Sequence, residues 1–466
     1  MSIVTPTTPS TPATAAPPEV EALRDLLPGR VITPIDPAWQ HARLGWSVNV
    51  DQRPAAVVTV SDPDDVALVT RHARSTGLTV SAQPVGHGAS TSLSGTVLLR
   101  TGALAECSVD PVRRVARVGA GLKWQPLLDA AGEHGLTGLC GSSSDPSVAG
   151  FCLGGGLSWF SRAHGLAANS VRAVDLVDAD GQCRRVDAEH DPELFWAVRG
   201  GGGEFGIVTA MELDLFPADP LYGGRLLWPI EQAAAVVDAF RRIVADAPDE
   251  LSVWLHLLRF PPLPTIPEPL RGGQFVSLDF TYLGSAEAGA ALMAPARAVG
   301  AAPILDTGGL MPVARLAEIV AEPTEPMPSA HWSTLLDDLD DATVASLLEV
   351  AGPGANCPLL IVQLRHLGGA LRRPAATAGS AGGLDAPFEL LGLGVPMVPE
   401  LADAVQAGLT ELASAVRPVD SGRAPYTFLS ADEPPDRAYP PDVLARLRRI
   451  KAARDPQRVI GGNHPL

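Results

Sequence analysis

Lysine is almost absent from this chain of 466 residues, in which Lys123 and Lys451 stand among 35 basic side chains. A mechanism built on a lysine Schiff base therefore has few candidates. The five cysteines are odd in number and show no Cys-x-x-Cys spacing, which predicts neither a disulfide framework nor a zinc site. The ten histidines show no His-x-x-x-His spacing, so we expect no bound metal.

Positive charge, long apolar runs and a secretory leader are also missing. The formal net charge of −17 disfavours nucleic acid and anionic membrane surfaces as partners. Because no run of 18 apolar residues occurs, we expect no membrane span. Residues 1–18 are rich in Thr, Pro and Ala without a basic or apolar leader region, which predicts a disordered tail and a cytoplasmic protein.

The first regular elements form a strand–helix–strand unit. Residues 55–61 have the β-branched composition of a strand, and Asp62 before Pro63 is typical of a helix start. Apolar residues recur at helical spacing as far as Gly77, and residues 78–83 predict a second strand.

The loop after this unit, residues 83–90, reads Gln-Pro-Val-Gly-His-Gly-Ala-Ser. Gly86 and Gly88 free the backbone on both sides of His87, so the loop can lie against a flat or anionic ligand while a ring nitrogen points at it. The plainer interpretation is a tight turn with a partly exposed histidine.

Two further glycine clusters follow. Residues 138–156 carry no strand or helix signal, and their small side chains expose backbone N–H groups that suit a diphosphate or a ring edge. A glycine-rich surface linker is the alternative. Residues 199–203 read Arg-Gly-Gly-Gly-Gly, which is not a Gly-x-Gly-x-x-Gly fingerprint and does not support a Rossmann NAD site.

Residues 217–220 look like a domain boundary, after which strands and helices alternate. We expect strands at 251–258, 274–283, 359–366 and 388–394, and helices at 285–299, 335–351, 401–416 and 440–453. This order predicts an antiparallel sheet covered by helices, an α+β fold. The glycine-rich tail 460–466 should fray unless it returns to the N-terminal half.

Six ordered motifs resemble one known family: the FAD-linked oxidases of the vanillyl-alcohol-oxidase (PCMH-type FAD-binding) superfamily, in their berberine-bridge-enzyme-like branch. The likeness runs from about residue 35 to the end. The motifs are Trp46…Asp51-x-Arg53-Pro54, Gly86-His87, Gly141-Ser142-Ser143…Gly150…Gly154-Gly155-Gly156 leading to Ser161-Arg162-x-His164-Gly165-Leu166, Asp191 to Gly200 running on to Phe205–Thr209, Leu364 to Gly369, and Asp455-Pro456…Asn463-His464-Pro465.

The resemblance implies an α+β fold with a two-part PCMH-type FAD-binding domain. It divides the chain into a disordered or irregular tail (1–34), an FAD-binding domain (35–216), a substrate domain (217–415) and a returning C-terminal segment (416–466). It also implies that His87 is joined covalently to the 8α-methyl of the isoalloxazine. The implied cofactor-binding residues are His87, Val85, Gly86, Gly88, Ala89, Ser90, Gly141, Ser142, Ser143, Val148, Gly150, Gly155, Gly156, Gly206, Val208, Asn463 and Pro465.

Many relatives carry a second, cysteinyl attachment in the following loop. The matching position here is Ser143, which cannot readily form a thioether, and Cys140 and Cys152 flank this position without aligning to it. We interpret both cysteines as small buried side chains. The expected cofactor is therefore FAD held by one covalent bond, through His87, beside a small or medium substrate.

The reaction implied by the resemblance transfers a hydride from an alcohol, sugar or amine carbon to the flavin, while a protein base takes the adjacent proton and O2 accepts the electrons to give H2O2. Tyr426 is the first candidate base, although the Tyr-x-Asn pattern of relatives lacks its asparagine here, and a structural tyrosine is the alternative. Gln363 and Arg365 should share one strand face and His366 the other. Glu389 is a further candidate base, with a solvated carboxylate as the more ordinary interpretation.

Other functions stay open at this point. The flavin could serve a dehydrogenase or an oxidative cyclase with little oxidase turnover, or the chain could be a binding module without turnover. The expected partners are a small-molecule substrate, for example a secondary metabolite, and O2, in a monomer or homodimer.

Overall fold

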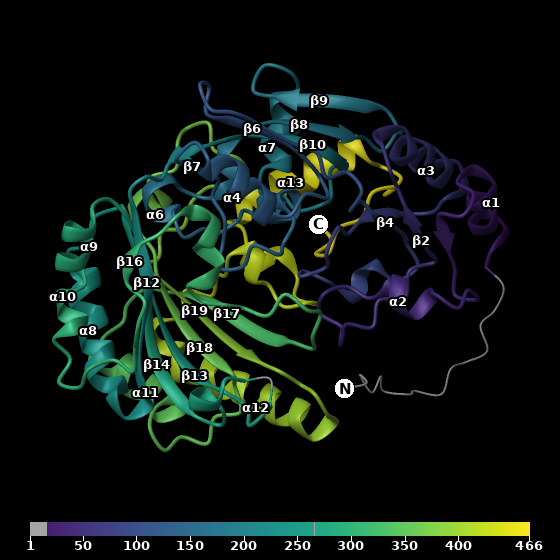
Figure 1. The fold of residues 1–466 in the computed structure, drawn as a ribbon. Helices are drawn as coiled ribbons and strands as arrows, with labels where there is room; N and C mark the ends of the chain where they lie inside the picture. The colour runs from purple at the N-terminus through teal and green to yellow at the C-terminus, as the bar shows by residue number, and fades with distance from the viewer. Residues whose placement is uncertain (1–15, 265) are drawn as a thin grey trace.

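The computed structural model describes residues 16–264 and 266–466, which build three main sheets (Figure 1). The first two belong to the N-terminal half. The first has the order β1(Val31–Ile32)-β2(Ala56–Thr59)-β4(Val97–Arg100)-β3(Val80–Ala82). The second has the order β5(Cys107–Asp110)-β6(Val115–Gly119)-β10(Ile207–Asp214)-β8(Val171–Val177)-β9(Cys183–Asp187).

The predicted strand–helix–strand unit is confirmed. Helix α3 (Pro63–Thr76) begins at Asp62, whose carboxylate accepts a hydrogen bond from Asp65 N at 2.9 Å, and ends at Gly77 with φ +77°. Left-handed backbone at this position favours glycine. The apolar side of α3 is buried on the first sheet. The helix connects β2 to β3, and these two strands lie parallel on the two sides of β4.

The expectation of an irregular tail over residues 1–34 is wrong for its described part, and residues 1–15 lie outside the described residues. Helix α1 (Pro18–Leu26) and β1 occupy this stretch. Val20, Leu23 and Leu27 are at most 1% exposed and pack into the core of the first sheet. Their spacing along one helix face gives the segment enough apolar area to stay ordered.

The remaining helices and short strands of this half connect the sheets. They are α2 (Trp39–Arg43), α4 (Trp124–Gly132), β7 (Leu136–Thr137), α5 (Val148–Leu153), α6 (Ser161–His164), α7 (Pro192–Val198) and β11 (Phe216–Pro217).

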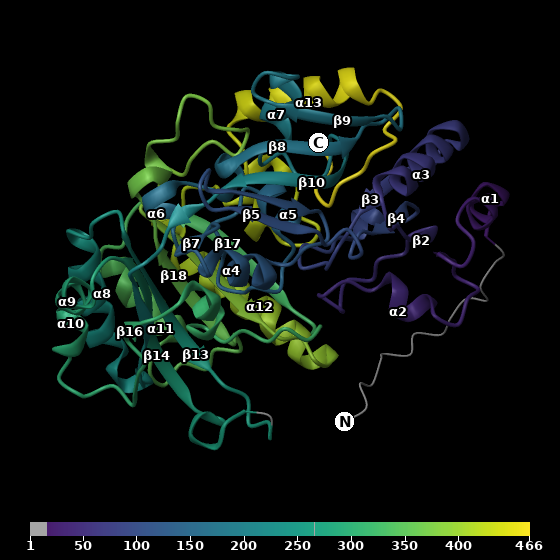
Figure 2. The same cartoon turned by 45° about the horizontal axis from the view of Figure 1, so that its top comes forward.

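The third and largest sheet has eight antiparallel strands and is covered on its outer side by helices, as the sequence predicts (Figure 2). Its order is β15(Leu305–Asp306)-β12(Leu221–Pro229)-β14(Gln274–Leu283)-β13(Leu251–Arg259)-β18(Ile361–His366)-β19(Phe388–Gly394)-β17(Ala330–Leu336), with β16 (Gly309–Leu310) beside β12. The helices are α8 (Ala233–Ala245), α9 (Ala286–Leu292), α10 (Ala294–Arg297), α11 (Asp341–Ala351) and α12 (Pro399–Ala415).

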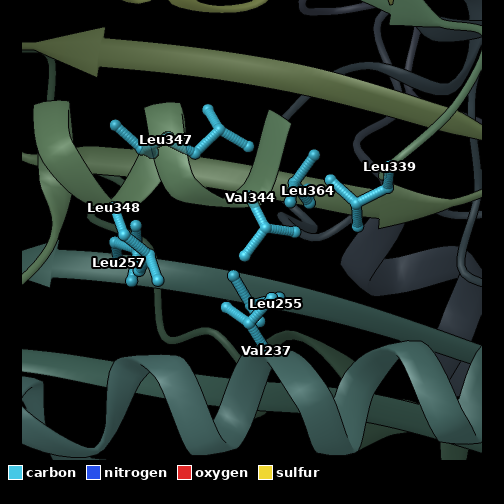
Figure 3. A pocket seen from close by; sticks show the side chains of 9 residues that line it. Val237, Leu255, Leu257, Leu339, Val344, Leu347, Leu348 and Leu364 are labelled. Atoms are coloured by element: carbon cyan, nitrogen blue, oxygen red, sulfur yellow. The ribbon is translucent and has the colours of Figure 1, made fainter. Parts of the chain in front are cut away.

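The two faces of this large sheet differ in chemistry. Along β13, Val253, Leu255 and Leu257 face the helices, whereas Trp254 and His256 face the N-terminal half. Figure 3 shows an apolar cavity on the helix side, lined by α8, α11, β13 and β18. No polar side chain lines it, so we assign it to packing between the sheet and its helices.

One expected helix is wrong at its start. Residues 335–351 were expected to be helical, but Leu335 and Leu336 end strand β17, and α11 begins only after Asp340, which accepts a hydrogen bond from Thr343 N at 2.7 Å. The apolar residues of 335–351 therefore belong to a strand, a turn and a helix, and not to one helix.

Strands β5, β12 and β17 are not predicted from the sequence.

Arg162 joins the two halves of the molecule. From α6 its guanidinium donates to the carbonyls of Leu251 (2.7 Å), Ala247 (3.0 Å) and Pro248 (3.1 Å) and lies 3.1 Å from His366 Nε2. Burial and the neighbouring Arg162 charge lower the pKa of His366 to about 3, so this ring is neutral and can accept the hydrogen bond.

The C-terminal segment returns to the N-terminal half, where helix α13 (Pro441–Arg454) lies beside α7 (Figure 1). The tail then pairs with β3, with Val80 N donating to Val459 O at 2.7 Å. The buried Lys451 ammonium fixes this return by donating to Asp455 Oδ2 (2.8 Å) and to the carbonyls of Glu204 and Ile460 (2.7 Å each).

Replacing this lysine should destabilise the fold strongly. In Lys451→Met, two carbonyls lose this donor and the buried Asp455 carboxylate loses its positive partner, keeping only the N–H groups of Val459 and Ile460. This change should cost about 3 kcal/mol or more of the free energy of unfolding. Urea unfolding measures this loss. Arg448→Met, on the exposed side of α13, should change the same quantity by less than about 0.5 kcal/mol. Equal effects of the two changes would contradict the assigned role of Lys451.

No helix among the described residues is both long and apolar enough to cross a membrane. Within residues 16–264 and 266–466, no group of His, Cys, Asp and Glu is arranged to hold a metal ion.

Candidate cofactor and active site

His87 lies on the loop after β3, in a conformation that its neighbours fix. Gly86 has φ +99°, and a Cβ there would meet Gly45 Cα at 2.5 Å, so only glycine fits. The Trp46 ring stacks on the imidazole with centroids 4.6 Å apart. The His87 side chain is 27% exposed, which leaves the ring open on its other side.

Asp145 and Lys123 hold the imidazole. Asp145 Oδ2 lies 2.8 Å from His87 Nε2, and the Lys123 ammonium donates to the other carboxylate oxygen. Burial would raise the pKa of Asp145, but hydrogen bonds from His87 and Lys123 lower it below its usual value. The Asp145 carboxylate is therefore ionised at neutral pH, and it orients the His87 ring. Neither residue is predicted by a motif in the sequence, although the scarcity of lysine is a signal for Lys123.

The second glycine cluster is more regular than expected. Residues 148–153 of the stretch expected to lack secondary structure form α5, whose first turn is capped by Ser147 Oγ, which accepts from Gly150 N at 3.1 Å. Val148 and Gly150 therefore lie in a helix. Gly155 and Gly156 follow with φ +94° and +73°, and a Cβ at Gly156 would clash with Phe151 and Ala167.

The position that matches the second attachment site carries a hydroxyl and no thiol. Ser143 Oγ accepts from Asp145 N at 3.3 Å, and its carbonyl accepts from Cys140 Sγ at 3.5 Å. Cys140 and Cys152 are free and 1% exposed, as expected for small buried side chains. Burial raises the pKa of the Cys152 thiol to about 12, so it is not a thiolate at neutral pH.

The loops meet at the C-terminal tail. Ser92 Oγ donates to Asn463 O at 2.8 Å, which ties the His87 loop to the tail. A Cβ at Gly88 would have Asn463 Nδ2 at 3.2 Å as its one close neighbour, and a Cβ at Gly203 would have only Gly462 Cα at 3.9 Å. Gly88 and Gly203 therefore each leave room beside the C-terminal tail, which suits contact with a large anionic cofactor.

The other expected cofactor residues lie on these same segments. Of the full set, Gly86, Ala89, Ser90, Gly141, Val148, Gly155, Gly156, Gly206 and Val208 are buried, Val85, His87, Ser142, Ser143 and Asn463 are half-buried, and Gly88, Gly150 and Pro465 are exposed.

The polar face of the large sheet supplies a buried acid. Glu389 on β19 is 0% exposed, and neither of its carboxylate oxygens has a hydrogen-bond partner among the described residues. The expectation of a solvated carboxylate is therefore wrong, because the N-terminal half covers this face. Burial raises the pKa of Glu389 to about 7, against the opposing charge of Arg365, whose Nε lies 3.4 Å from Glu389 Oε2.

Arg365 sits in a stack of flat groups that crosses the domain boundary. Its guanidinium lies 4.2 Å from the Trp254 ring and 4.5 Å from the Phe428 ring. Trp254 in turn stacks on Trp159, with centroids 3.4 Å apart. Gln363 Oε1 accepts from Arg365 Nε at 2.6 Å, so these two residues share a face as predicted, whereas His366 faces Arg162.

Comparison with known proteins points to FAD binding by the N-terminal half. Residues 54–187 match the family model described as an FAD binding domain. The chain is 37% identical over 209 residues to the FAD-dependent monooxygenase FUP4 of Fusarium proliferatum, a match that covers 44% of this chain and 40% of that protein. It is 33% identical over 192 residues to (R)-6-hydroxynicotine oxidase of Paenarthrobacter nicotinovorans, covering 40% of this chain and 42% of that one.

Solved structures extend the likeness to the whole fold. BBE-like 1 of Physcomitrella patens aligns over 96% of this chain and 98% of its own, with a TM-score of 0.81 and 20% identity. This chain therefore shares its fold with that berberine-bridge-enzyme-like (BBE-like) protein. A second neighbour, 6-hydroxy-D-nicotine oxidase from Arthrobacter nicotinovorans, aligns over 94% and 98% with a TM-score of 0.76 and 22% identity. By sequence, the chain spans well under two thirds of the curated relatives it matches.

Tyr426 belongs to the packing around the glycine loops. Its ring lies edge-on to His464 with centroids 5.1 Å apart, and a Cβ at Gly202 would fall 2.3 Å from the Tyr426 hydroxyl. Burial, helped by the charge of Glu204, raises the pKa of the phenol. A phenol of this kind can donate a hydrogen bond, but far less of it is ionised at neutral pH than of Glu389, so it is less available as a base.

Asp145 can be tested apart from His87. Asp145→Asn should retain the fold but leave the imidazole without its anionic partner, so covalent flavin incorporation should fall about tenfold. Fluorescence of flavin on the denatured polypeptide, relative to total protein, measures this fraction. Asp180→Asn, at an exposed carboxylate, serves as the matched control and should incorporate as much flavin as wild type. Unchanged incorporation in Asp145→Asn would contradict the role given to Asp145.

Proposed function

We propose that this protein is an FAD-dependent oxidoreductase, an oxidase, whose flavin is attached through His87 alone. The observation that carries the proposal is a half-buried histidine, oriented by Asp145, on a glycine loop that is hydrogen-bonded to the C-terminal tail and has room beside its backbone at Gly88. Because Asp145 engages Nε2, Nδ1 is the ring nitrogen left for a bond to the cofactor. Ser143 explains why a second covalent bond is not expected.

FAD, when bound, supplies the hydride acceptor, and O2 takes the electrons to give H2O2. The protein's own task is to hold the substrate and to remove the proton of its O–H or N–H group. Glu389 is our choice for the base, because a buried carboxyl with a pKa of about 7 can accept a proton at neutral pH. Arg365 keeps part of the Glu389 population ionised, and the stacked Trp159, Trp254 and Phe428 rings exclude water from that pair.

The proposed substrate is small or medium in size, with an oxidisable alcohol, sugar or amine carbon. Polar side chains on the inner face of the large sheet support a hydroxyl- or amine-bearing molecule, for example a secondary metabolite. Similar proteins are named for substrates of these classes, since they include an oxidase of 6-hydroxynicotine and a glucose dehydrogenase.

The experiment is a substrate panel of alcohols, sugars and cyclic amines offered to the purified, flavin-loaded protein. An oxidase should bleach its flavin anaerobically and release H2O2 in air in proportion to substrate consumed. Dye reduction without H2O2 would indicate a dehydrogenase instead, and product formation with a new ring would indicate a cyclase. A colourless purified protein would contradict every flavin-based function.

A further inference from the structure

A row of buried polar side chains crosses five strands on the inner face of the large sheet. Cross-strand pairing places Arg225 opposite Asp279, His256 opposite Gln363, and Arg365 opposite Glu389. Each of the last five is at most 3% exposed. Buried polar groups in such a number are costly unless they hold one another in a defined arrangement.

In the middle of the row, each hydrogen bond has a defined donor and acceptor. Arg365 Nε can only donate, so Gln363 must present its amide oxygen to it, at 2.6 Å. The Gln363 amide nitrogen then points to His256 Nε2, with which it is in close contact. His256 must accept this bond, so its ring proton lies on Nδ1.

The far end of the row favours this state of His256. Burial lowers the pKa of His256 to about 4, although the Asp279 charge opposes the change, so the ring is neutral. His256 Nδ1 lies 3.2 Å from Asp279 Oδ2. The angles do not meet the criteria of a hydrogen bond, but the Asp279 carboxylate still attracts the Nδ1–H group electrostatically. Arg225 fixes the Asp279 carboxylate with two bonds of 2.7 and 2.5 Å.

The near end is Arg365 beside Glu389. Because Trp254 and Phe428 sandwich the guanidinium, its polar edge has few directions to turn, and the bond to Gln363 selects one of them. The charge of Glu322 also raises the pKa of Arg365, as it does that of Arg225. Without the Gln363 bond, the Arg365 guanidinium loses the hydrogen bond that fixes its position beside Glu389.

We propose that His256 and Gln363 are positioning residues that hold Arg365 against Glu389 and so set how much of Glu389 is ionised at neutral pH. The catalytic consequence rests on the proposed function of Glu389 as the base, but the effect on its ionisation does not. Asp279 and Arg225 anchor the row at its other end.

Infrared difference spectroscopy of the flavin-loaded protein tests this proposal without any substrate. The C=O stretch of a protonated carboxyl that wild type shows and Glu389→Gln lacks reports Glu389, and its midpoint in wild type should lie at about pH 7. His256→Leu and Gln363→Leu should each raise that midpoint by about one unit or more, because Glu389 loses its fixed cation. His256→Gln offers Gln363 an acceptor again and should shift the midpoint less.

The matched control is His366→Leu, which removes a buried histidine from β18 itself but outside the row, and it should leave the midpoint in place. Unmoved midpoints in His256→Leu and Gln363→Leu, with native circular dichroism, would overturn the proposal. So would an equal shift in His366→Leu. Should His256→Leu not fold, Gln363→Leu decides alone. If Glu389 is not the base, Glu389→Gln will oxidise substrate normally while the midpoint shifts persist, so the two ideas fail separately.

Discussion

Glu389→Gln should reduce the rate of flavin reduction by substrate about 10²- to 10⁴-fold, the range typical of a lost general base. Glutamine retains the size and one acceptor oxygen of the side chain but cannot take up a proton. Stopped-flow absorbance under anaerobic conditions, with a substrate from the panel, measures the rate. The covalent flavin content should equal that of wild type, because Glu389 lies on the large sheet and not on the cofactor loops.

The role of Glu389 as a base also predicts the direction in which the reduction rate changes with pH. A base works when ionised, so the wild-type rate should rise with pH through a midpoint at about 7, and Glu389→Gln should lose that dependence. Glu349→Gln, on the outer helix α11, is a suitable control and should retain both rate and midpoint. A Glu389→Gln enzyme with the wild-type rate would assign the base elsewhere, with Tyr426→Phe as the next variant to examine.

His87→Ala should abolish covalent flavin on the polypeptide while leaving the fold intact. The side chain is 27% exposed and lies on a loop, so its loss removes little core packing. Acid denaturation should then release all flavin into the supernatant, and the purified protein should carry less flavin than wild type. Retained, fluorescent polypeptide after denaturation of His87→Ala would show that another residue forms the bond.

His190→Ala controls for the loss of a histidine, because His190 is 72% exposed and its ring bonds to Asp187 at the end of β9. It should bind flavin covalently to the wild-type extent.

Local signals explain why parts of the fold were predictable. Helix α3 begins after its N-cap Asp62 and ends at the left-handed Gly77. Strand β19 (Phe388–Gly394) covers the range that the sequence predicts. Helix α5 was missed because glycine at position 150 and a serine-rich approach look like a loop, although Ser147 caps the helix. Such elements depend on tertiary packing that no window of sequence contains.

The site shows the same division. Gly86, His87 and the glycine clusters are visible as motifs, whereas Asp145 reaches His87 across 58 positions and has no motif of its own. Glu389 looks like a surface carboxylate, because one strand cannot show that a second domain covers its polar face. The row from Asp279 to Arg365 is likewise a property of strand register, which the sequence alone does not specify.

Attachment of FAD through His87 alone is most directly tested by peptide mass spectrometry of the denatured, protease-digested wild-type protein. We expect one modified peptide, the one that contains His87, with the mass of FAD added, and unmodified peptides containing Cys140, Ser143 and Cys152. Complete release of FAD on denaturation, or FAD on any of those other peptides, would contradict this account.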